Sequence, residues 1–145
     1  MNTQRLAAWA ATFAVLLALD MLWLGVVAKD MYQREIGTLM SPDPRLGVAA
    51  VFYLLYPIGL LVFAVVPGLR AQGVLRAALL GSLFGLFCYG TYDLTNLATI
   101  RDWPLALSFI DMAWGTLVSG VAAGAGALAL RSNVTRARQS RANKD

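Results

Sequence analysis

The sequence lacks histidine altogether, contains one cysteine and is poor in charged residues. Without histidine, the chain lacks the side chain that most often ligates metals or acts as a general base near neutral pH. The single cysteine, Cys88, excludes an intramolecular disulfide. Charged residues make up 14% of the chain and apolar residues 59%, whereas a soluble domain carries about 25% charged residues. This composition is that of an integral membrane protein.

Four long apolar runs each have the length of a membrane-spanning helix. A hydrocarbon core of about 30 Å is crossed by about 20 helical residues. We predict an all-α, integral membrane four-helix bundle in one domain, residues 1–130, with spans at about residues 6–27, 46–66, 74–98 and 105–130. Residues 131–145 are basic and polar and are expected to form a disordered tail. A cleaved signal peptide is the alternative for the first run, although Asp20 and Trp23 fit it poorly.

The basic residues are unequally divided between the two ends of such a bundle. Four spans place both termini on one side, and eight of the 12 Lys and Arg residues lie on that side. Cytoplasmic segments of membrane proteins carry an excess of Lys and Arg. We therefore expect the N- and C-termini to be cytoplasmic and the protein to be a multi-pass component of the cell inner membrane.

Three of the predicted spans contain an acidic residue. Asp20, Asp93 and Asp111 all fall roughly 8 to 11 Å below the non-cytoplasmic surface when counted at 1.5 Å per residue. Tyr53 in the second span falls at the same depth. An ionised Asp at the centre of a membrane helix costs about 2.5–3.5 kcal/mol, so such residues normally mark a functional site.

Helical spacing adds aromatic and polar side chains to this acidic layer. Trp23 follows Asp20 by three residues, Trp114 follows Asp111 by three, and Tyr89 precedes Asp93 by four. Residues three or four apart share one face of a helix. We therefore predict a pocket in the non-cytoplasmic half of the bundle with nine ligand-binding residues: Asp20, Trp23, Tyr53, Tyr89, Tyr92, Asp93, Asn96, Asp111 and Trp114.

The other half of the bundle is expected to be closed by small residues. Gly81 and Gly85 in the third span, and Gly120 and Gly124 in the fourth, form the small-xxx-small pattern that lets membrane helices approach closely. Simple hydrogen bonding between helices is the alternative role of the polar layer. Neutral Asn or Ser would perform that role at lower cost than three acids.

Three ionised acids in one small pocket would repel each other. Two like charges 4 Å apart add roughly 4 kcal/mol at an effective dielectric constant of 20. The sequence places no Lys or Arg at the depth of the acids. We therefore expect at least one acid to be protonated at about pH 7, or a bound cation to compensate them.

Two classes of function fit this layer. In the first, the pocket binds or transports a small amphipathic or cationic molecule, held by acids and by cation–π contacts. In the second, the protein is a membrane-embedded enzyme that acts on a lipid or isoprenoid by Asp acid/base chemistry. A structural or accessory membrane subunit, or a homo-oligomer, is also compatible with so short a chain. We expect membrane lipids as partners, and no metal site, cofactor or nucleic acid.

Several segments resemble one known family. They are LALDMLWLG at residues 17–25, FYLLYPIGLLVFAVVP at residues 52–67, YGTYDLTNLATIRDWP at residues 89–104 and DMAWG at residues 111–115. In these segments the chain resembles a bacterial family of four-span membrane proteins, domain of unknown function 2177. The resemblance covers nearly all of the chain up to Leu130. It implies a small inner-membrane protein with four spans, and it implies no activity, substrate or cofactor.

Overall fold

The computed structural model describes residues 3–71 and 73–142, with side chains described up to residue 132, and all regular structure in this part of the chain is helical. Four helical rods are long and apolar enough to cross a membrane: residues Thr3–Val27, Leu46–Ala71, Val74–Thr99 and Leu105–Ser132. The predicted all-α membrane bundle is therefore confirmed. Its elements are α1 (Thr3–Leu22), η1 (Trp23–Val27), α2 (Lys29–Ile36), η2 (Gly37–Leu39), α3 (Leu46–Leu60), η3 (Leu61–Val65), α4 (Val66–Ala71), α5 (Val74–Thr99) and α6 (Leu105–Ala142).

Helix α6 does not stop at residue 130, where the fourth span was predicted to end. It continues to Ala142, so the backbone of residues 131–142 is helical, and residues 143–145 lie outside the described residues. Ala, Arg and Gln in this segment are good helix formers, which favours continuation of the helix beyond the apolar run. The division of the chain into a domain and a tail at residue 130 stays a prediction.

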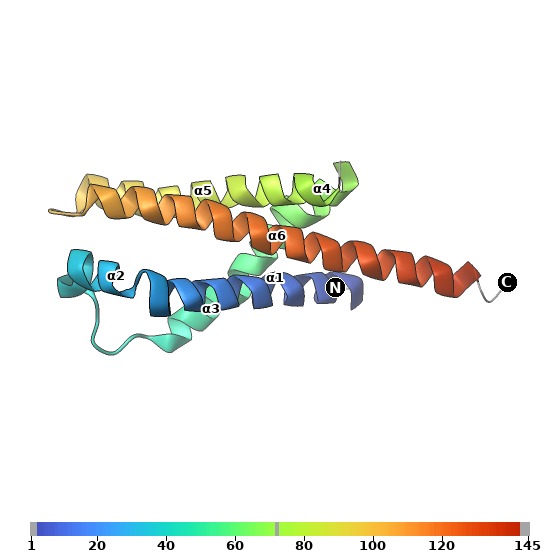
Figure 1. The fold of residues 1–145 in the computed structure, drawn as a ribbon, viewed down its shortest axis with the longest axis horizontal. Helices are drawn as coiled ribbons and strands as arrows, with labels where there is room; N and C mark the ends of the chain where they lie inside the picture. Colours follow the sequence, from blue (N-terminus) through green and yellow to red (C-terminus); the bar gives the residue numbers. More distant parts are fainter. Residues whose placement is uncertain (1–2, 72, 143–145) are drawn as a thin grey trace.

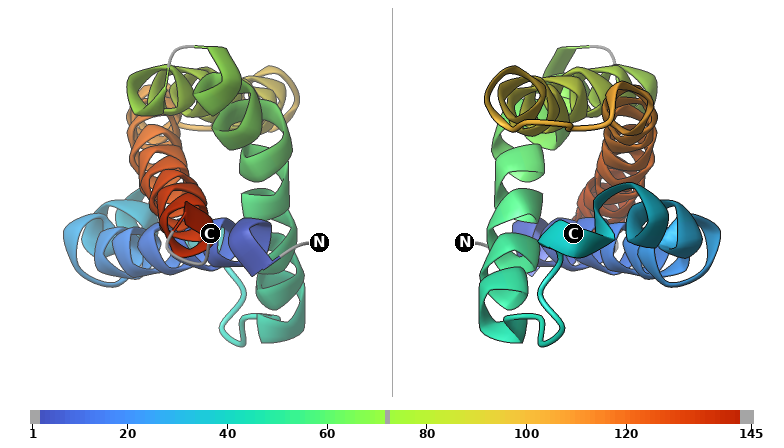
Figure 2. Two further views of the ribbon diagram at one scale, coloured as in Figure 1. Left: turned by 90° about the vertical axis from the view of Figure 1, so that its right-hand side faces the viewer. Right: turned by 90° about the vertical axis from the view of Figure 1, so that its left-hand side faces the viewer.

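Helices α1, α5 and α6 run roughly side by side, and the rod formed by α3, η3 and α4 crosses obliquely from α1 to α5 (Figures 1 and 2). Helices α5 and α6 form an antiparallel pair, α1 packs against α6, and the rod formed by α3, η3 and α4 completes the bundle against α5 and α1. The N-terminus, the end of α6 and the α4–α5 turn lie at one end. The opposite end, called here the α2 end, carries α2, the loop of residues 40–45 and the α5–α6 turn.

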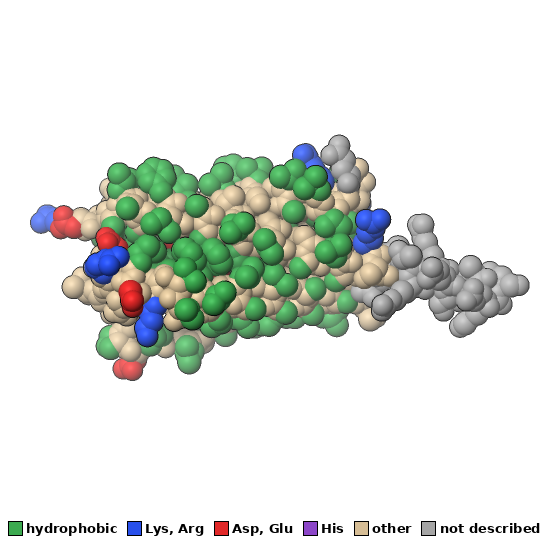
Figure 3. All heavy atoms as spheres, in the orientation of Figure 1, with side chains coloured by type: hydrophobic (Ala, Val, Ile, Leu, Met, Phe, Trp, Pro, Cys, Tyr) green, Lys and Arg blue, Asp and Glu red, His purple; other side chains and the backbone are tan. Residues whose placement is uncertain are grey.

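The surface agrees with a membrane location. Large apolar side chains project outwards along the rods, among them Leu46 at 76%, Leu75 at 73% and Val26 at 71% exposure. Figure 3 shows such side chains in a broad belt between the two ends of the molecule, and the charged side chains gather outside this belt. Because lipid tails are as apolar as these side chains, the belt is the lipid-facing surface.

Glycines on α5 let this helix approach α6 closely, as the small-xxx-small pattern predicted. A methyl group added to Gly81 would meet the Cβ of Ala123 at 2.5 Å, and one added to Gly85 would overlap the carbonyl oxygen of Gly115. On α6, a methyl group on Gly120 would overlap the hydroxyl of Ser82. The α5–α6 pair is therefore held at a distance that only glycine allows at these positions.

Gly85→Ala is expected to destabilise the bundle by about 1–3 kcal/mol, which is the usual cost of overpacking a filled interior. Gly47→Ala in α3 is the matched control, because nothing lies within 4 Å of a methyl group there. Gly47 is the second residue of α3, where the advantage of Ala over Gly is at most the roughly 1 kcal/mol of a helix interior, so the control should be neutral or slightly more stable. Thermal unfolding in detergent measures both variants. Equal stability of the two variants would contradict the close packing of α5 on α6.

Candidate functional site

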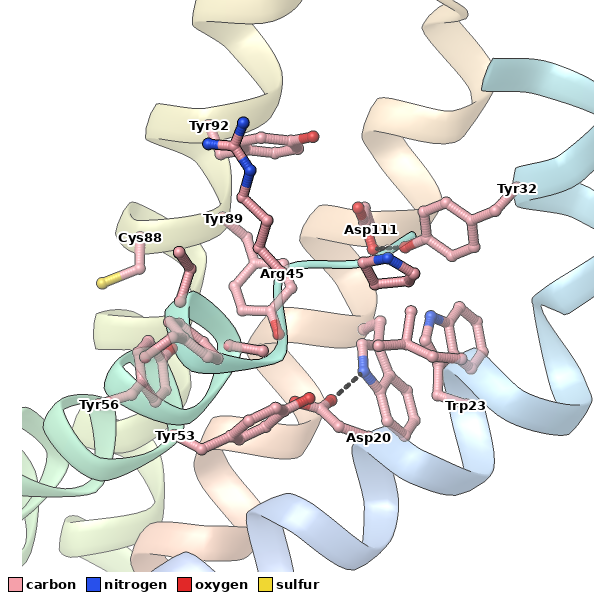
Figure 4. A pocket seen from close by; sticks show the side chains of 16 residues that line it. Asp20, Trp23, Tyr32, Arg45, Tyr53, Tyr56, Cys88, Tyr89, Tyr92 and Asp111 are labelled. Carbon is pink, nitrogen blue, oxygen red and sulfur yellow. Dashed lines mark hydrogen bonds between the residues drawn. The ribbon is translucent and has the colours of Figure 1, made fainter. Parts of the chain in front are cut away.

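A cavity of about 710 Å³ lies between the helices toward the α2 end of the bundle. It is lined by residues of α1, η1, α2, α3, α5 and α6 and by the loop that precedes α3. Aromatic rings make up much of its wall (Figure 4). Seven of the nine predicted pocket residues line it: Asp20, Trp23, Tyr53, Tyr89, Tyr92, Asp111 and Trp114.

The first carboxyl group of the cavity is Asp20, near the end of α1. Its side chain is 3% exposed, and its Oδ1 accepts a hydrogen bond of 2.9 Å from Nε1 of Trp114 on α6. The indole of Trp114 stacks on that of Trp23, with ring centroids 4.4 Å apart and an interplanar angle of 5°. The hydroxyl of Tyr53 on α3 points toward Asp20 (Figure 4). Three rods of the bundle therefore meet at this carboxyl group.

The second carboxyl group is Asp111 on α6, which is 7% exposed. Its Oδ1 accepts a hydrogen bond from the hydroxyl of Tyr32, which comes from α2 outside the membrane-spanning rods. Burial and the neighbouring Asp111 carboxyl raise the pKa of the Tyr32 phenol, so this tyrosine stays protonated and acts as the donor. The indole nitrogen of Trp23 is buried and has no hydrogen-bond partner in the described part of the chain.

Asp93 and Asn96, which we predicted as pocket residues, do not line the cavity. Tyr89 and Tyr92 on the same helix do line it. Successive residues of a helix are about 100° apart, so Asp93 lies on the other side of Tyr89 from Tyr92, outside the cavity wall. Asn96 lies on the same face as Tyr92 but one turn closer to the end of α5, beyond the cavity. Asp93 is 0% exposed, and neither of its carboxyl oxygens has a hydrogen-bond partner among the described residues.

Several residues of the cavity were not predicted. Tyr32 comes from α2, and Arg45 and Pro44 come from the loop before α3. Arg45 lines the cavity and extends towards Tyr92 at its exposed edge (Figure 4). A loop that folds back over a bundle has no periodic signal in the sequence, so these residues could not be placed from spacing.

Other missed residues lie on the predicted spans and did carry a signal. Tyr56 follows Tyr53 by three residues and Phe52 by four, so the three rings lie on neighbouring faces of α3. The hydroxyl of Tyr56 is hydrogen-bonded to that of Ser119 on α6 at 2.8 Å. Cys88 lies against the cavity one residue before Tyr89. The remaining lining residues are Leu24, Val48 and Ala49.

The arrangement combines two buried carboxyl groups with electron-rich aromatic faces in a largely apolar space. Trp114 donates a hydrogen bond to Asp20 and Tyr32 donates one to Asp111, whereas an ionised carboxylate has about four acceptor sites. Both groups therefore keep acceptor capacity for a molecule in the cavity. Among the described residues, no group of three or more His, Cys, Asp or Glu side chains is placed to hold a metal ion.

The sequence matches one family model over most of its length. The model is described as "Predicted membrane protein (DUF2177)" and matches residues 5–128. No curated protein and no solved structure matches the sequence. The match covers nearly all of the four rods and every residue that lines the cavity. The resemblance seen in the sequence is thereby confirmed, and the chain belongs to the DUF2177 family of predicted membrane proteins.

Proposed function

We propose that this membrane protein binds a small amphipathic cation in the cavity and serves as its carrier or receptor. The observation that carries the proposal is the pair of buried carboxyl groups, Asp20 and Asp111, that face one aromatic cavity. The volume of about 710 Å³ falls within the range of about 300–1,000 Å³ that small-molecule pockets occupy.

The chemistry of the walls favours a positive charge on the ligand. A carboxylate attracts a cation at 4 Å by about 4 kcal/mol at an effective dielectric constant of 20. The stacked indoles of Trp23 and Trp114 and the phenol of Tyr53 offer ring faces beside Asp20, and ring faces attract cations by about 0.5–2 kcal/mol each. The apolar part of the ligand would contact the aliphatic and aromatic side chains of α3, such as Val48 and Phe52.

The positive charge of Arg45 lies in a more exposed position than the two carboxyl groups. It is exposed, whereas Asp20 and Asp111 are buried at 3% and 7% exposure. Solvent screens an exposed charge much more than a buried one. The field inside the cavity is therefore set mainly by the carboxyl groups, and it favours a cation.

A second candidate is a membrane-embedded enzyme that acts on a lipid or isoprenoid. The observation in its favour is that two carboxyl groups in different hydrogen-bonding environments face the same cavity. Such pairs serve as general acid and general base. For an enzyme, Asp20→Asn and Asp111→Asn would keep substrate binding and lose turnover, whereas for a carrier or receptor they would lose binding.

We also propose that both termini are cytoplasmic and that the protein lies in the inner membrane. The α2 end carries both acidic and basic side chains, whereas the opposite end carries only basic ones in Figure 3. The excess of Lys and Arg at that opposite end supports its cytoplasmic location.

A labelling experiment tests this orientation. In a Cys88→Ser background, a cysteine introduced by Asp43→Cys is expected to react with a membrane-impermeant maleimide added to intact spheroplasts. A cysteine introduced by Ser140→Cys should react only after the membrane has been opened. The reverse pattern would contradict the proposed orientation, and the geometry of the cavity would be unaffected.

The proposed function is tested with two ions of nearly the same size and shape and of opposite charge, tetraphenylphosphonium and tetraphenylborate. Purified protein in a neutral detergent is expected to bind tetraphenylphosphonium saturably in equilibrium dialysis, with at least tenfold preference over tetraphenylborate. Because the two ions share their apolar surface, a preference reports the sign of the charge in the cavity. Equal binding of both ions, or preference for the anion, would refute the proposal.

A further inference from the structure

Asp93 is the most unusual titratable group outside the cavity. It lies on α5 at 0% exposure, and both of its carboxyl oxygens lack a hydrogen-bond partner among the described residues. At the same end of the α5–α6 pair, the indole nitrogen of Trp103 donates to the hydroxyl of Ser108 at 3.0 Å, so this donor is already used. A carboxyl group that served only to link helices would have a partner, and Asp93 has none in this part of the chain.

Burial without a partner strongly favours the neutral form of a carboxyl group. An isolated buried carboxylate is so costly that it takes up a proton instead. The titratable groups that act on Asp93 are Asp111 on α6, Tyr32 on α2 and Tyr92 on its own helix. None of these three supplies a positive charge. Asp111 supplies a negative one when ionised, which further disfavours a second charge on Asp93.

Asp111 connects Asp93 with the cavity. It lines the cavity from α6, while Asp93 lies directly after Tyr92 and one helical turn after Tyr89, which line the same cavity from α5, so the charge of Asp111 acts on Asp93. A cation bound beside Asp111 would compensate its negative charge and act directly on Asp93 as well. Both effects lower the cost of an ionised Asp93, so cation binding and loss of a proton are linked by the same electrostatic interaction.

We propose that Asp93 is a proton-binding site coupled to the cavity, so that the protein exchanges one proton for one amphipathic cation. In the empty protein, Asp93 is a neutral carboxylic acid. When the cation enters, the proton leaves the carboxyl oxygen of Asp93 for water, and Asp93 becomes a carboxylate. The total charge of the occupied bundle is unchanged, because one positive charge enters as one leaves. This inference rests on the proposed binding of a cation in the cavity.

The pH dependence of binding tests the exchange. If one proton is released per cation, the affinity of wild-type protein for tetraphenylphosphonium rises with pH by up to tenfold per pH unit until Asp93 is ionised in the empty protein. Asp93→Asn keeps the shape and neutrality of the protonated acid. It is expected to bind with the affinity that wild type shows at low pH and to lose this pH dependence. Asp102→Asn, an exposed site, is the matched control and should behave as wild type.

Direct proton release gives a second measurement of the exchange. The chain has no histidine, and an exposed carboxyl group, with a pKa of about 4, is already ionised at about pH 6. The released proton therefore comes from a buried acid, and Asp93→Asn distinguishes Asp93 from Asp20 and Asp111. Addition of tetraphenylphosphonium chloride to weakly buffered wild-type protein at about pH 6 should therefore release up to one proton per bound cation. Asp93→Asn should release none.

The two proposals fail in different ways. If wild type does not bind tetraphenylphosphonium, the proposed function is overturned. If wild type binds it without proton release, or if Asp93→Asn releases as many protons as wild type, only the assignment of Asp93 is overturned. A variant that fails to fold leaves the wild-type proton measurement as the deciding one.

Discussion

Replacing both cavity carboxyl groups, in the double variant Asp20→Asn/Asp111→Asn, is expected to weaken tetraphenylphosphonium binding at least a hundredfold. Each carboxylate contributes up to about 4 kcal/mol of attraction at an effective dielectric constant of 20. A tenfold change in affinity corresponds to about 1.4 kcal/mol, so the loss of half of that attraction at each site suffices. Each single variant should lose at least tenfold.

Asparagine is a conservative replacement at both positions. Its side-chain oxygen can still accept the hydrogen bond of Trp114 Nε1 at position 20 and that of the Tyr32 hydroxyl at position 111. The double variant Asp43→Asn/Asp102→Asn removes the same charge from exposed positions and should bind as wild type. Equilibrium dialysis measures affinity, and thermal unfolding shows that the fold is kept. If the folded double variant Asp20→Asn/Asp111→Asn binds less than threefold more weakly than wild type, the two carboxyl groups do not hold the cation.

Trp114→Ala is expected to destabilise the protein by about 3 kcal/mol, the low end of the usual cost of truncating a large core aromatic side chain, because Trp114 is half-buried. Two contacts explain the size of the effect. The stack on Trp23 contributes about 0.5–1.5 kcal/mol beyond burial. The hydrogen bond to Asp20, if that group is charged, contributes about 1.5–3 kcal/mol, and its loss takes a donor away from a carboxyl group that is 3% exposed.

Trp114→Phe separates these two contributions. The phenyl ring can still stack on Trp23, but it has no N–H to donate to Asp20. Its stability should therefore lie between those of wild type and Trp114→Ala, measured by denaturant titration in mixed micelles. If Trp114→Ala unfolds at the same denaturant concentration as wild type, Trp114 is not the bridge between α1 and α6 that the structure shows.

The fold could be predicted from the sequence because the membrane imposes simple rules. A run of about 20 apolar residues predicts a membrane-spanning segment. Such a segment forms a helix, because its backbone groups must hydrogen-bond to one another inside the lipid. The glycine pattern predicted close helix packing, and the backbone carbonyl of Gly115 lies where a side chain on Gly85 would be. Which two helices pack in this way was not predicted. The end of the last helix could not be predicted, because α6 continues to Ala142 in polar sequence.

The candidate site was predicted less completely than the fold. Depth in the membrane identified Asp20 and Asp111. Helical spacing identified the tryptophans three residues after each of them, because residues three or four positions apart share a helix face. The same rule could not fix how far α5 is rotated about its axis, and this rotation moves Asp93 out of the cavity wall. Tyr32 and Arg45 depend on how α2 and the following loop fold over the bundle, which hydropathy does not encode.

The central claim is that Asp20 and Asp111 hold a cation between aromatic walls, and an anomalous-scattering experiment tests it most directly. Tetraphenylarsonium has the shape and charge of tetraphenylphosphonium, and its arsenic atom can be located in crystals grown from a lipidic mesophase. The account predicts an arsenic peak inside the cavity, within about 6 Å of the Trp23–Trp114 stack or of the Tyr53 ring, as a cation–π contact requires. An empty cavity with arsenic peaks on the lipid-facing surface alone would contradict it.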